Sequence, residues 1–452
     1  MHAFCNRLQN LRVFMSFHLK TAPPREPKDL TNVEDTVRTM ISRIRSEGDS
    51  AVQHYASKLD QWDSKDFRVT EDKIRETASR LPETFKDDFA FSLRNVQEFA
   101  KRQRDALVEF HAEVSPGVTL GQKQIPISRA GCYVPGGRYP LVAAAGMSVG
   151  TAKVAGVEHV TGCAPPRPGE DGMYPYTLYA LHAAGADEIY CIGGVQAMAS
   201  MAFGRVGMSA VDIITGPGNA FVAEAKRQLF GTVGIDIPAG PTEILILCDE
   251  AADASLVATD LLGQAEHGPD SPAWLVTTSE AIGRAVLIEV ERQLKTLPTA
   301  ELARTSWDAY GEIVVAESPE EACALVDAYA PEHLEIQTIR DDWYLDRLRN
   351  YGSAFVGPEA TVAYGDKGIG TNHTLPTGGA ARYTGGLSVG KFIKTVTWQR
   401  LSRAASYKMA GPLGRLCRIE DMQAHALTCD ARETRYEQDN NRADGKDQGA
   451  NP

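Results

Sequence analysis

Residue types that can bind a metal ion occur at several separate places in this chain. Gln264 and His267 are three residues apart in a segment of helical periodicity, so both side chains leave one face of a helix and can converge on one ion. Asp366 stands in a glycine-rich loop, residues 364–373, that has no apolar periodicity, and long irregular loops are often functional. Together with His425, these residues make a metalloenzyme the leading hypothesis.

A pair of ionisable residues, Glu332 and His333, joins a predicted helix to a predicted strand. Their unperturbed pKa values of about 4.3 and 6.5 suit proton transfer near neutral pH. An isolated pair of this kind is usually a surface feature, and the same holds for Gln264 and His267 taken alone. The interpretation therefore depends on all these residues acting at one site.

Two glycine-rich turns are candidate anion sites. Residues 135–137 (Pro-Gly-Gly) and 216–219 (Gly-Pro-Gly-Asn) each end a predicted strand and precede a predicted helix. Free backbone N–H groups and the helix dipole favour a phosphate at such a place. Neither turn matches the GxGxxG pattern, and each alone is typical of an ordinary turn. Their occurrence in one α/β series favours a phosphate or dinucleotide ligand.

The elements that must position these residues alternate between strand and helix. One series covers about residues 129–248, and a second covers about residues 252–356. Such alternation predicts parallel sheets covered by helices on both faces. We therefore expect an α/β fold with two parallel-sheet Rossmann-like units and helical N- and C-terminal additions. The predicted strands are residues 129–134, 159–163, 188–192, 211–215, 244–248, 273–278, 312–316, 334–338 and 353–356.

We place the domain boundaries from these patterns. The predicted parts are an N-terminal extension (1–28), a catalytic α/β domain (29–132 and 242–387), an NAD-binding-like α/β domain (133–241), a C-terminal helical module (388–435) and a disordered tail (436–452). The tail is polar and rich in Asp and Asn, which favours disorder. Residues 1–25 contain basic but no acidic residues, the charge balance of an organellar transit peptide. Alternatively, translation starts at Met15.

Composition limits the classes of partner. The 452 residues are 43% hydrophobic with a formal net charge of −12, which fits an ordinary globular protein and argues against nucleic-acid binding. The sequence has no apolar run of about 18 residues, so we expect no membrane span. The eight cysteines form no CxxC pair, which favours reduced structural thiols. We expect a cytoplasmic enzyme with a small-molecule substrate.

A series of motifs in order resembles the histidinol dehydrogenase family over residues 31–432. The motifs are Tyr133-Val134-Pro135-Gly136-Gly137, Gly194-Val195-Gln196-Ala197, Gly216-Pro217-Gly218-Asn219, Ala239-Gly240-Pro241-Thr242-Glu243, Gln264-Ala265-Glu266-His267-Gly268-Pro269, Tyr329-Ala330-Pro331-Glu332-His333-Leu334-Glu335, Gly370-Thr371-Asn372-His373, and Glu420 with Ala424-His425. The resemblance implies a zinc-dependent homodimer with shared active sites. It also implies that two NAD are used in turn to oxidise a primary alcohol through an aldehyde to a carboxylate.

The resemblance also implies a role for each matching residue. Glu332 would activate water and His333 would accept the hydroxyl proton. The implied sets are Gln264, His267, Asp366 and His425 of the partner subunit as zinc ligands; Tyr133, Gln196 and Asn219 as NAD contacts; and Thr242, Glu420, His333 and the zinc ligands as substrate contacts. Such nitrogen and oxygen ligands would also accept manganese.

Two substrates stay open. Family members that make histidine oxidise L-histidinol to L-histidine, and they usually carry Ser where Thr242 stands. Residues 380–394 instead look like the sulfopropanediol dehydrogenase branch, which oxidises 2,3-dihydroxypropane-1-sulfonate to sulfolactate. In that run Arg382, Lys391 and Lys394 suit an anion better than a cationic amine, although they could simply solvate the loop or pair with the acidic partner subunit. A third possibility is an inactive homologue that serves as a binding protein.

Overall fold

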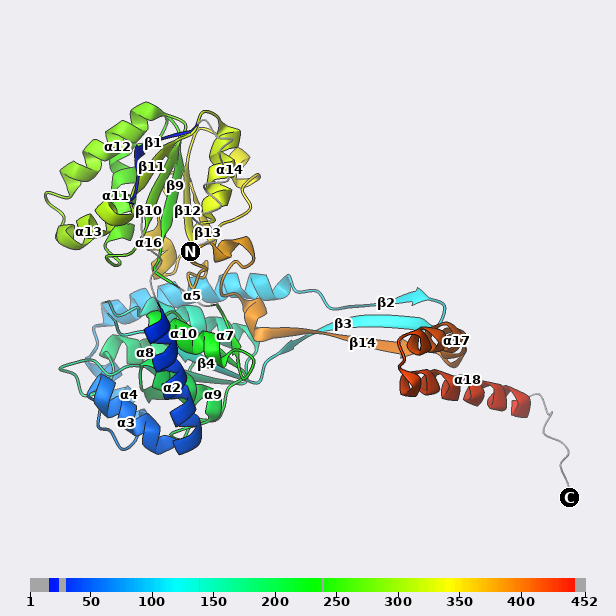
Figure 1. Cartoon of the computed structure of the whole chain (residues 1–452). Coiled ribbons are helices and arrows are strands. Elements are labelled where there is room, and N and C mark those ends of the chain that lie inside the picture. The colour runs from blue at the N-terminus through cyan, green and yellow to red at the C-terminus, as the bar shows by residue number, and fades with distance from the viewer. Residues whose placement is uncertain (1–15, 24–29, 138, 238–239, 444–452) are drawn as a thin grey trace, which may run out of the picture. The chain divides into compact units, whose positions relative to one another are not determined.

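The structure is a computed structural model that describes residues 16–23, 30–137, 139–237 and 240–443 (Figure 1). The chain divides into two compact units. The first unit contains residues 1–104 and 126–392, and the second contains residues 105–125 and 393–452.

The first unit contains a parallel sheet of five strands, in the order β6-β5-β4-β7-β8. Strand β4 is central. From β4 the chain first adds β5 and β6 on one side and then adds β7 and β8 on the other side. The strand order therefore reverses between β4 and β7, as in doubly wound folds. The strands are β4 (Arg129–Tyr133), β5 (His159–Ala164), β6 (Glu188–Cys191), β7 (Ile213–Thr215) and β8 (Gly234–Ile235). The connecting helices are α6 (Ala143–Ala145), η1 (Gly146–Gly150), α7 (Thr151–Ala155), α8 (Pro175–Ala183), α9 (Gly194–Phe203) and α10 (Ala220–Leu229).

A second sheet in this unit has six strands in the order β1-β11-β10-β9-β12-β13. Five of them repeat the arrangement of the first sheet, and β1 (Phe17–Lys20) pairs antiparallel with β11 at the edge. The parallel strands are β9 (Ile244–Cys248), β10 (Ala273–Thr277), β11 (Glu312–Val315), β12 (His333–Gln337) and β13 (Ser353–Val356). Helices α11 (Ala254–Ala265), α12 (Glu280–Gln293) and α13 (Ala300–Tyr310) share one apolar core with the sheet, and α14 (Pro319–Tyr329) and α15 (Asp341–Leu345) share the other.

The N-terminal helices belong to the core of the five-stranded sheet. Val37 and Ile44 of α2 (Thr31–Glu47) and Val52 of α3 (Asp49–Asp60) are completely buried in one cluster with α9 and α10. This differs from the predicted boundaries, which assigned residues 29–132 to the catalytic domain and cut β4 at its last residue. Helices α4 (Glu71–Arg80) and α5 (Glu83–Asp105) follow, and α16 (Val362–Lys367), η2 (Ala380–Arg382) and η3 (Val389–Phe392) complete the unit.

The second unit combines a small sheet with two helices. Its elements are β2 (Phe110–Ser115), β3 (Val118–Pro126), β14 (Ile393–Leu401), α17 (Arg403–Ile419) and α18 (Gln423–Ala443), and the sheet order is β14-β3-β2. The sequence predicted only helices for residues 388–435, so β14 is a difference. Helix α18 also continues past residue 436, where the disordered tail was predicted to begin. Residues 444–452 and 1–15 lie outside the described residues.

The predicted fold class, α/β with two parallel-sheet units, is confirmed. Within the described part of the chain the seven cysteines are free, and four of them are buried in strands. No helix in the same residues is long and apolar enough to cross a membrane.

Candidate active site

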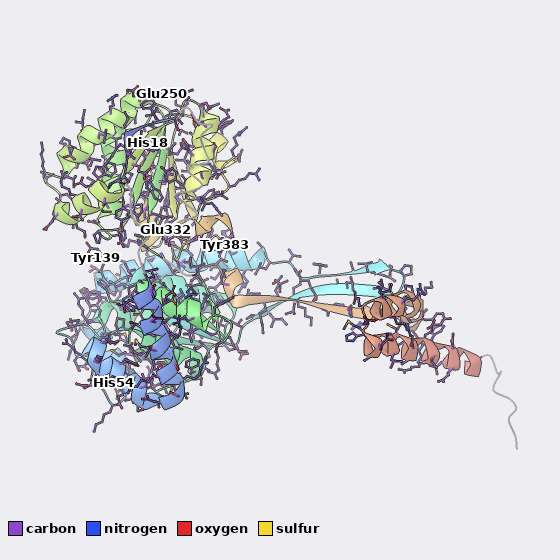
Figure 2. The ribbon with its side chains drawn as sticks, in the orientation of Figure 1. His18, His54, Tyr139, Glu250, Glu332 and Tyr383 are labelled. Atoms are coloured by element: carbon purple, nitrogen blue, oxygen red, sulfur yellow. The ribbon has the colours of Figure 1, made fainter. Side chains whose placement is uncertain are left out.

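Glu332 and His333 lie at the start of β12, beside the start of β9. His333 is in register with Ile244, so Thr242 and Glu243 immediately before β9 lie next to the pair. Figure 2 labels Glu332 at this edge. The site is thus built on the amino ends of the six-stranded sheet, although open α/β sheets usually bind ligands at the carboxyl ends of their strands.

A chain of hydrogen bonds connects Gln264, in the last turn of α11, to Glu332. Gln264 Nε2 donates to Thr242 Oγ1 (2.8 Å), and the Thr242 hydroxyl donates to Glu332 Oε2 (2.6 Å). This direction turns Gln264 Oε1 away from Thr242. That carbonyl oxygen is buried and has no hydrogen-bond partner among the described residues. Leaving a buried acceptor unpaired costs about 1 to 3 kcal/mol, so an absent ligand is expected to satisfy it.

The tautomer of His333 follows from its contacts. Its Nδ1 lies 2.9 Å from the carbonyl oxygen of Glu243, and a carbonyl can only accept, so Nδ1 carries the proton. Burial lowers the pKa of His333 to about 4, so the ring is neutral at pH 7. The remaining nitrogen, Nε2, is buried without a partner in the part of the chain that the structure describes. His333 therefore presents a free lone pair.

Asp366 at the end of α16 contacts two histidines. His373 Nδ1 donates to Asp366 Oδ1 (3.1 Å). Burial opposes ionisation of Asp366, but this hydrogen bond and neighbouring positive charge lower its pKa to about 2, so it is a carboxylate. The two residues approach closely because residue 365 is glycine: a Cβ atom there would lie 2.0 Å from the His373 ring.

The predicted loop of residues 364–373 is helical up to Lys367, because α16 contains its first four residues. The loop that follows α16 is anchored to the helices of the five-stranded sheet. Asn372 Nδ2 donates to the carbonyl oxygen of Met147 (2.7 Å) and to Thr151 Oγ1 (3.2 Å). Asn95 on α5 donates to the carbonyl oxygen of Gly368 (3.2 Å). These bonds fix a loop whose position could not be read from periodicity.

His267 completes a donor set that fits a metal ion. His267 Nε2 lies 3.9 Å from Asp366 Oδ2, and two atoms bound to one zinc at about 2.0 to 2.2 Å are separated by about 3 to 4 Å. Burial lowers the pKa of His267, which favours the neutral, ligating form. With the unpaired Gln264 Oε1, these atoms fit a zinc site. A second grouping of His333, Asp366 and His373 also has its ligand atoms within 4.8 Å of one another.

Two further predicted residues lie in the other unit. His425 is in α18 and Glu420 follows α17, so the first unit does not contain them.

Sequence reasoning did not assign His373 and Glu243 to the site. His373 Nε2 is buried without a partner among the residues described here. Burial raises the pKa of Glu243 to about 7, although the Gly378 N–H donates to its Oε1 (3.1 Å). Both residues stand in motifs quoted above, but only their contacts reveal that they face the predicted site residues.

The positions predicted to hold NAD gather at the carboxyl edge of the five-stranded sheet. Tyr133 ends β4, and its hydroxyl accepts a hydrogen bond from the Gly194 N–H (3.2 Å). Gly216 follows β7 with φ +120°, and a Cβ there would lie 2.0 Å from the Tyr133 carbonyl oxygen. Asn219 Oδ1 caps α10. Gln196 donates to Asp60 Oδ2 (2.8 Å), and its Oε1 has no partner within the described residues.

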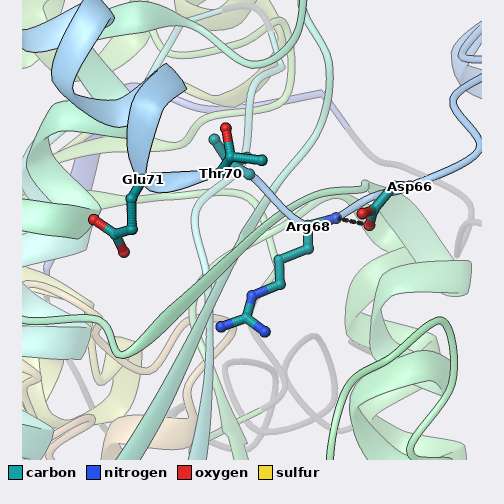
Figure 3. A pocket seen from close by; sticks show the side chains of 5 residues that line it. Asp66, Arg68, Thr70 and Glu71 are labelled. Carbon is teal, nitrogen blue, oxygen red and sulfur yellow. Dashed lines mark hydrogen bonds between the residues drawn. The ribbon is translucent and has the colours of Figure 1, made fainter.

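A hollow of about 280 Å³ lies beside this edge. The turn of residues 135–137 lines it together with Arg167, whose guanidinium lies 4.1 Å from the ring centroid of Tyr174. Another hollow of about 230 Å³ is lined by residues 66 and 68–71 (Figure 3). That second hollow contains none of the predicted site residues. Tyr139, in the loop after β4, donates to the carbonyl oxygen of Glu266 (3.2 Å), which connects this edge to the end of α11.

The cations predicted to recognise an anionic substrate lie in different settings. Arg382 donates to the carbonyl oxygens of Gly379 (2.9 Å) and Ala328, so its guanidinium binds backbone of the same chain. Lys391 is in η3, whereas Lys394 is in β14 of the second unit. Lys367, which the sequence analysis did not single out, has its Nζ 3.9 Å from Asp366 Oδ2 and a largely exposed side chain.

Comparison with known proteins decides the family. A model of the histidinol dehydrogenase family matches residues 24–433. The chain belongs to the histidinol dehydrogenase family. It is therefore an NAD-dependent dehydrogenase, as the resemblance implied.

Relatives within the histidinol dehydrogenase family carry different names. A histidinol dehydrogenase homolog of Shouchella clausii is 50% identical, covering 89% of this chain and 95% of that protein. A sulfopropanediol 3-dehydrogenase of Ruegeria pomeroyi is 48% identical, covering 93% and 96%. A histidinol dehydrogenase of Methanosarcina barkeri is 40% identical, covering 90% and 93%. The crystal structure of histidinol dehydrogenase from Elizabethkingia anophelis superposes with a TM-score of 0.85 at 34% identity, covering 92% and 95%.

Proposed function

We propose that this chain oxidises a primary alcohol through an aldehyde to a carboxylate, with zinc and two NAD. The observation that carries the proposal is the buried Gln264 Oε1 without a hydrogen-bond partner among the described residues, three residues before His267, whose Nε2 lies 3.9 Å from the Asp366 carboxylate. Gln264, His267 and Asp366 would hold the metal, with His425 of the partner subunit as the fourth ligand. When bound, zinc polarises the alcohol and carbonyl oxygens, and NAD serves as hydride acceptor.

His333 and Glu332 divide the proton transfers. The Nδ1–H bond to the Glu243 carbonyl holds the His333 ring and leaves Nε2 to take the hydroxyl proton of the alcohol. Burial raises the pKa of Glu332 well above its usual value, so its carboxylate is a stronger base and suits removal of a proton from water in the aldehyde step. Thr242 Oγ1 and the Glu243 N–H both donate to Glu332 Oε2, which leaves Oε1 for that task.

Single-turnover measurements with each variant test this division. His333→Ala should slow oxidation of the alcohol more than that of the aldehyde, and Glu332→Gln should do the reverse. Equal losses for both substrates in both variants would contradict the assignment.

We place NAD at the carboxyl edge of the five-stranded sheet. The turn after β7 precedes the amino end of α10, which attracts a phosphate, and it lies at the reversal of strand order where such sheets bind nucleotides. The hollow lined by residues 135–137 and Arg167 offers a cation to the same ligand. Tyr133, Gln196 and Asn219 would contact it.

For the substrate we favour 2,3-dihydroxypropane-1-sulfonate over L-histidinol. The relative named for sulfopropanediol is 48% identical to this chain, whereas the archaeal histidinol dehydrogenase is 40% identical. The ammonium group of Lys367 lies 3.9 Å from Asp366 Oδ2, and at that place it would favour an anionic substrate over the amine of L-histidinol. L-Histidinol stays the second candidate because the family carries its name.

Steady-state assays of both alcohols decide between them. Lys367→Met should raise KM for the sulfonate about 10-fold or more, as loss of a charge-assisted contact predicts, and should not raise KM for L-histidinol. Lys58→Met, an exposed change on α3, is the matched control. Efficient turnover of L-histidinol by the wild type, with no response to the sulfonate, would assign the chain to histidine synthesis.

The second unit supports a homodimer. Its two helices expose apolar side chains that soluble surfaces seldom gather in one small unit: Leu413, Leu416, Ile419, Met422 and Leu427. We propose that a second copy of the chain covers them and that His425 and Glu420 complete the partner's site. An inactive homologue that serves only as a binding protein would need no such site residues. Wild-type protein that holds no zinc and oxidises neither alcohol would favour that alternative.

A further inference from the structure

A polar cluster of buried and half-buried residues joins the elements that carry Gln264, His333 and Asp366. It consists of Asp260 on α11, Glu335 and Gln337 on β12, and Thr361 immediately before α16. Glu335 is completely buried and Gln337 is 2% exposed. The mechanism proposed above uses none of these residues.

Hydrogen bonds connect the three elements through this cluster. Thr361 Oγ1 donates to Asp260 Oδ1 (3.1 Å), and the Val362 N–H donates to Glu335 Oε1 (3.3 Å). Gln337 Nε2 lies between the two carboxyl groups, 3.3 Å from Glu335 Oε2 and 3.5 Å from Asp260 Oδ2. Thr361 is the residue before α16, yet its side chain makes no helix-capping bond. Its hydroxyl bonds to α11 instead.

Gln337 Nε2 is thus within hydrogen-bond reach of both carboxyl groups and joins them. Asp260 accepts from Thr361 and Gln337, and Glu335 accepts from the Val362 N–H and Gln337. Burial raises the pKa of both carboxyl groups.

Each connected element carries one site residue. Asp260 is one helical turn before Gln264, so both side chains leave the same face of α11. Glu335 is two residues after His333 on the same face of β12. Thr361 and Val362 begin the short helix that ends with Asp366 and Lys367.

We propose that the Asp260–Glu335 pair is a positioning tie that sets the separation of Gln264, His333 and Asp366. The proposal rests on the proposed function in so far as these residues hold zinc and accept a proton. Two carboxyl groups packed between a helix and a sheet are costly, and apolar residues of similar size would usually stabilise the fold as well or better. Their short, directional bonds instead fix how far α11, β12 and α16 stand apart.

Two near-isosteric substitutions test the tie, because both oxygens of each carboxyl group accept a hydrogen bond. Asp260→Asn brings an amide donor against the donor of Thr361 or Gln337. Glu335→Gln likewise brings an amide donor against the Val362 N–H or Gln337 Nε2. We expect zinc binding about 10- to 100-fold weaker, as is typical when a partner of a metal ligand is lost. Chelator competition measures the affinity, and the visible spectrum of the cobalt-substituted protein reports the ligand geometry.

Two further variants keep the test decisive. Gln293→Ala removes bonds from α12 to Ser255 and Thr259 on another face of α11, so it should lower the unfolding midpoint without changing zinc affinity. Should Asp260→Asn fail to fold, Thr361→Val removes a single donor and should still weaken zinc binding, by about 10-fold.

Wild-type zinc affinity and an unchanged cobalt spectrum in folded Asp260→Asn would overturn the tie. A wild type that binds no zinc would contradict the proposed function instead. In that case the NMR signals of the His267, His333 and His373 rings test the tie without zinc. Asp260→Asn should shift these signals, and Gln293→Ala should not. Unshifted signals in Asp260→Asn would overturn the tie in that case.

Discussion

At the residue scale, three buried side-chain atoms near the amino ends of β9 and β12 lack hydrogen-bond partners among the described residues. They are Gln264 Oε1, His333 Nε2 and His373 Nε2. In each side chain the other polar atom already has a partner: Thr242 for Gln264, Glu243 for His333 and Asp366 for His373. That hydrogen bond fixes the orientation of the side chain and leaves the second atom unpaired. The contacts therefore determine which atoms are offered to a metal or a substrate.

Thr242 is the residue whose hydroxyl fixes both Gln264 and Glu332. Thr242→Val leaves Gln264 Nε2 unpaired and frees the amide to turn, so zinc affinity should fall about 10- to 100-fold and turnover should fall with it. Thr242→Ser keeps the hydroxyl and is the matched control. Chelator competition on both variants checks this, and equal zinc affinity in Thr242→Val and wild type would contradict it.

His333 should make the metal-free protein sensitive to acid. Its pKa is about 4 in the folded protein and about 6.5 when unfolded, so between these values the unfolded chain binds more protons. Its contribution to stability is therefore complete above pH 6.5 and is lost as pH falls toward 4. Relative to His333→Gln, the wild type should lose about 2 to 3 kcal/mol of unfolding free energy between pH 7 and 4.5. Urea titrations at both pH values measure the difference; parallel losses would contradict the assignment.

Gln264 and His267 could be singled out from sequence because of their types and helical spacing, and the structure brings His267 Nε2 within 3.9 Å of Asp366 Oδ2. The sequence could not show that Asp366 also bonds to His373, or that Arg382 is engaged by backbone carbonyls. Those contacts join segments distant in the chain, and no local periodicity encodes them.

At the element scale, the two proposed sites lie at opposite edges of their sheets. The proposed metal ligands lie near the amino ends of the six-stranded sheet, and the turns after β4 and β7, where NAD is proposed to bind, lie at the carboxyl ends of the five-stranded sheet. The alternation of strands and helices was readable because the buried strands are apolar runs separated by glycine-rich turns. The strands β1, β2, β3 and β14 were not predicted, since short edge strands and exposed hairpins carry a weaker pattern.

The turn after β7 is held by a buried ion pair. Lys226 Nζ contacts Asp236 and donates to the carbonyl oxygen of Gly216 (2.9 Å), and Asp236 Oδ2 accepts from the Gly216 N–H (2.8 Å). The side chains are 2% and 0% exposed. Lys226→Met leaves Asp236 as an unpaired buried charge, so it should lower the unfolding free energy by about 3 to 5 kcal/mol and weaken NAD binding.

Urea unfolding and NAD titration measure these two effects. The control is Arg284→Ala, which breaks an exposed pair with Glu280 on α12 and should leave both measurements nearly unchanged. An equally small effect of Lys226→Met would show that the pair does not hold the turn.

At the scale of the whole molecule, the proposed shared active site requires two copies of the chain. Ile419 is 78% exposed at the end of α17, and Ile419→Asp places a charge on the apolar surface that a partner would cover. The variant should sediment as a monomer and lose turnover. Ile288→Asp, at a site 69% exposed on α12, should stay dimeric and active. A monomeric wild type, or a dimeric and active Ile419→Asp, would contradict the shared site.

Mixed subunits test the same point independently. Neither His267→Ala nor His425→Ala should be active alone, but a dimer with one of each keeps all four ligands at one site. Recovery of activity after subunit exchange is expected. No recovery after verified exchange would place His425 outside the partner's site.

The most direct test of the central claim is the stoichiometry of NADH formation by the zinc-loaded dimer with limiting 2,3-dihydroxypropane-1-sulfonate, and in parallel with L-histidinol. We expect two NADH per alcohol consumed, a carboxylate product, and loss of both after chelation with recovery on adding zinc. One NADH per alcohol with release of aldehyde, or turnover that chelation does not affect, would contradict it.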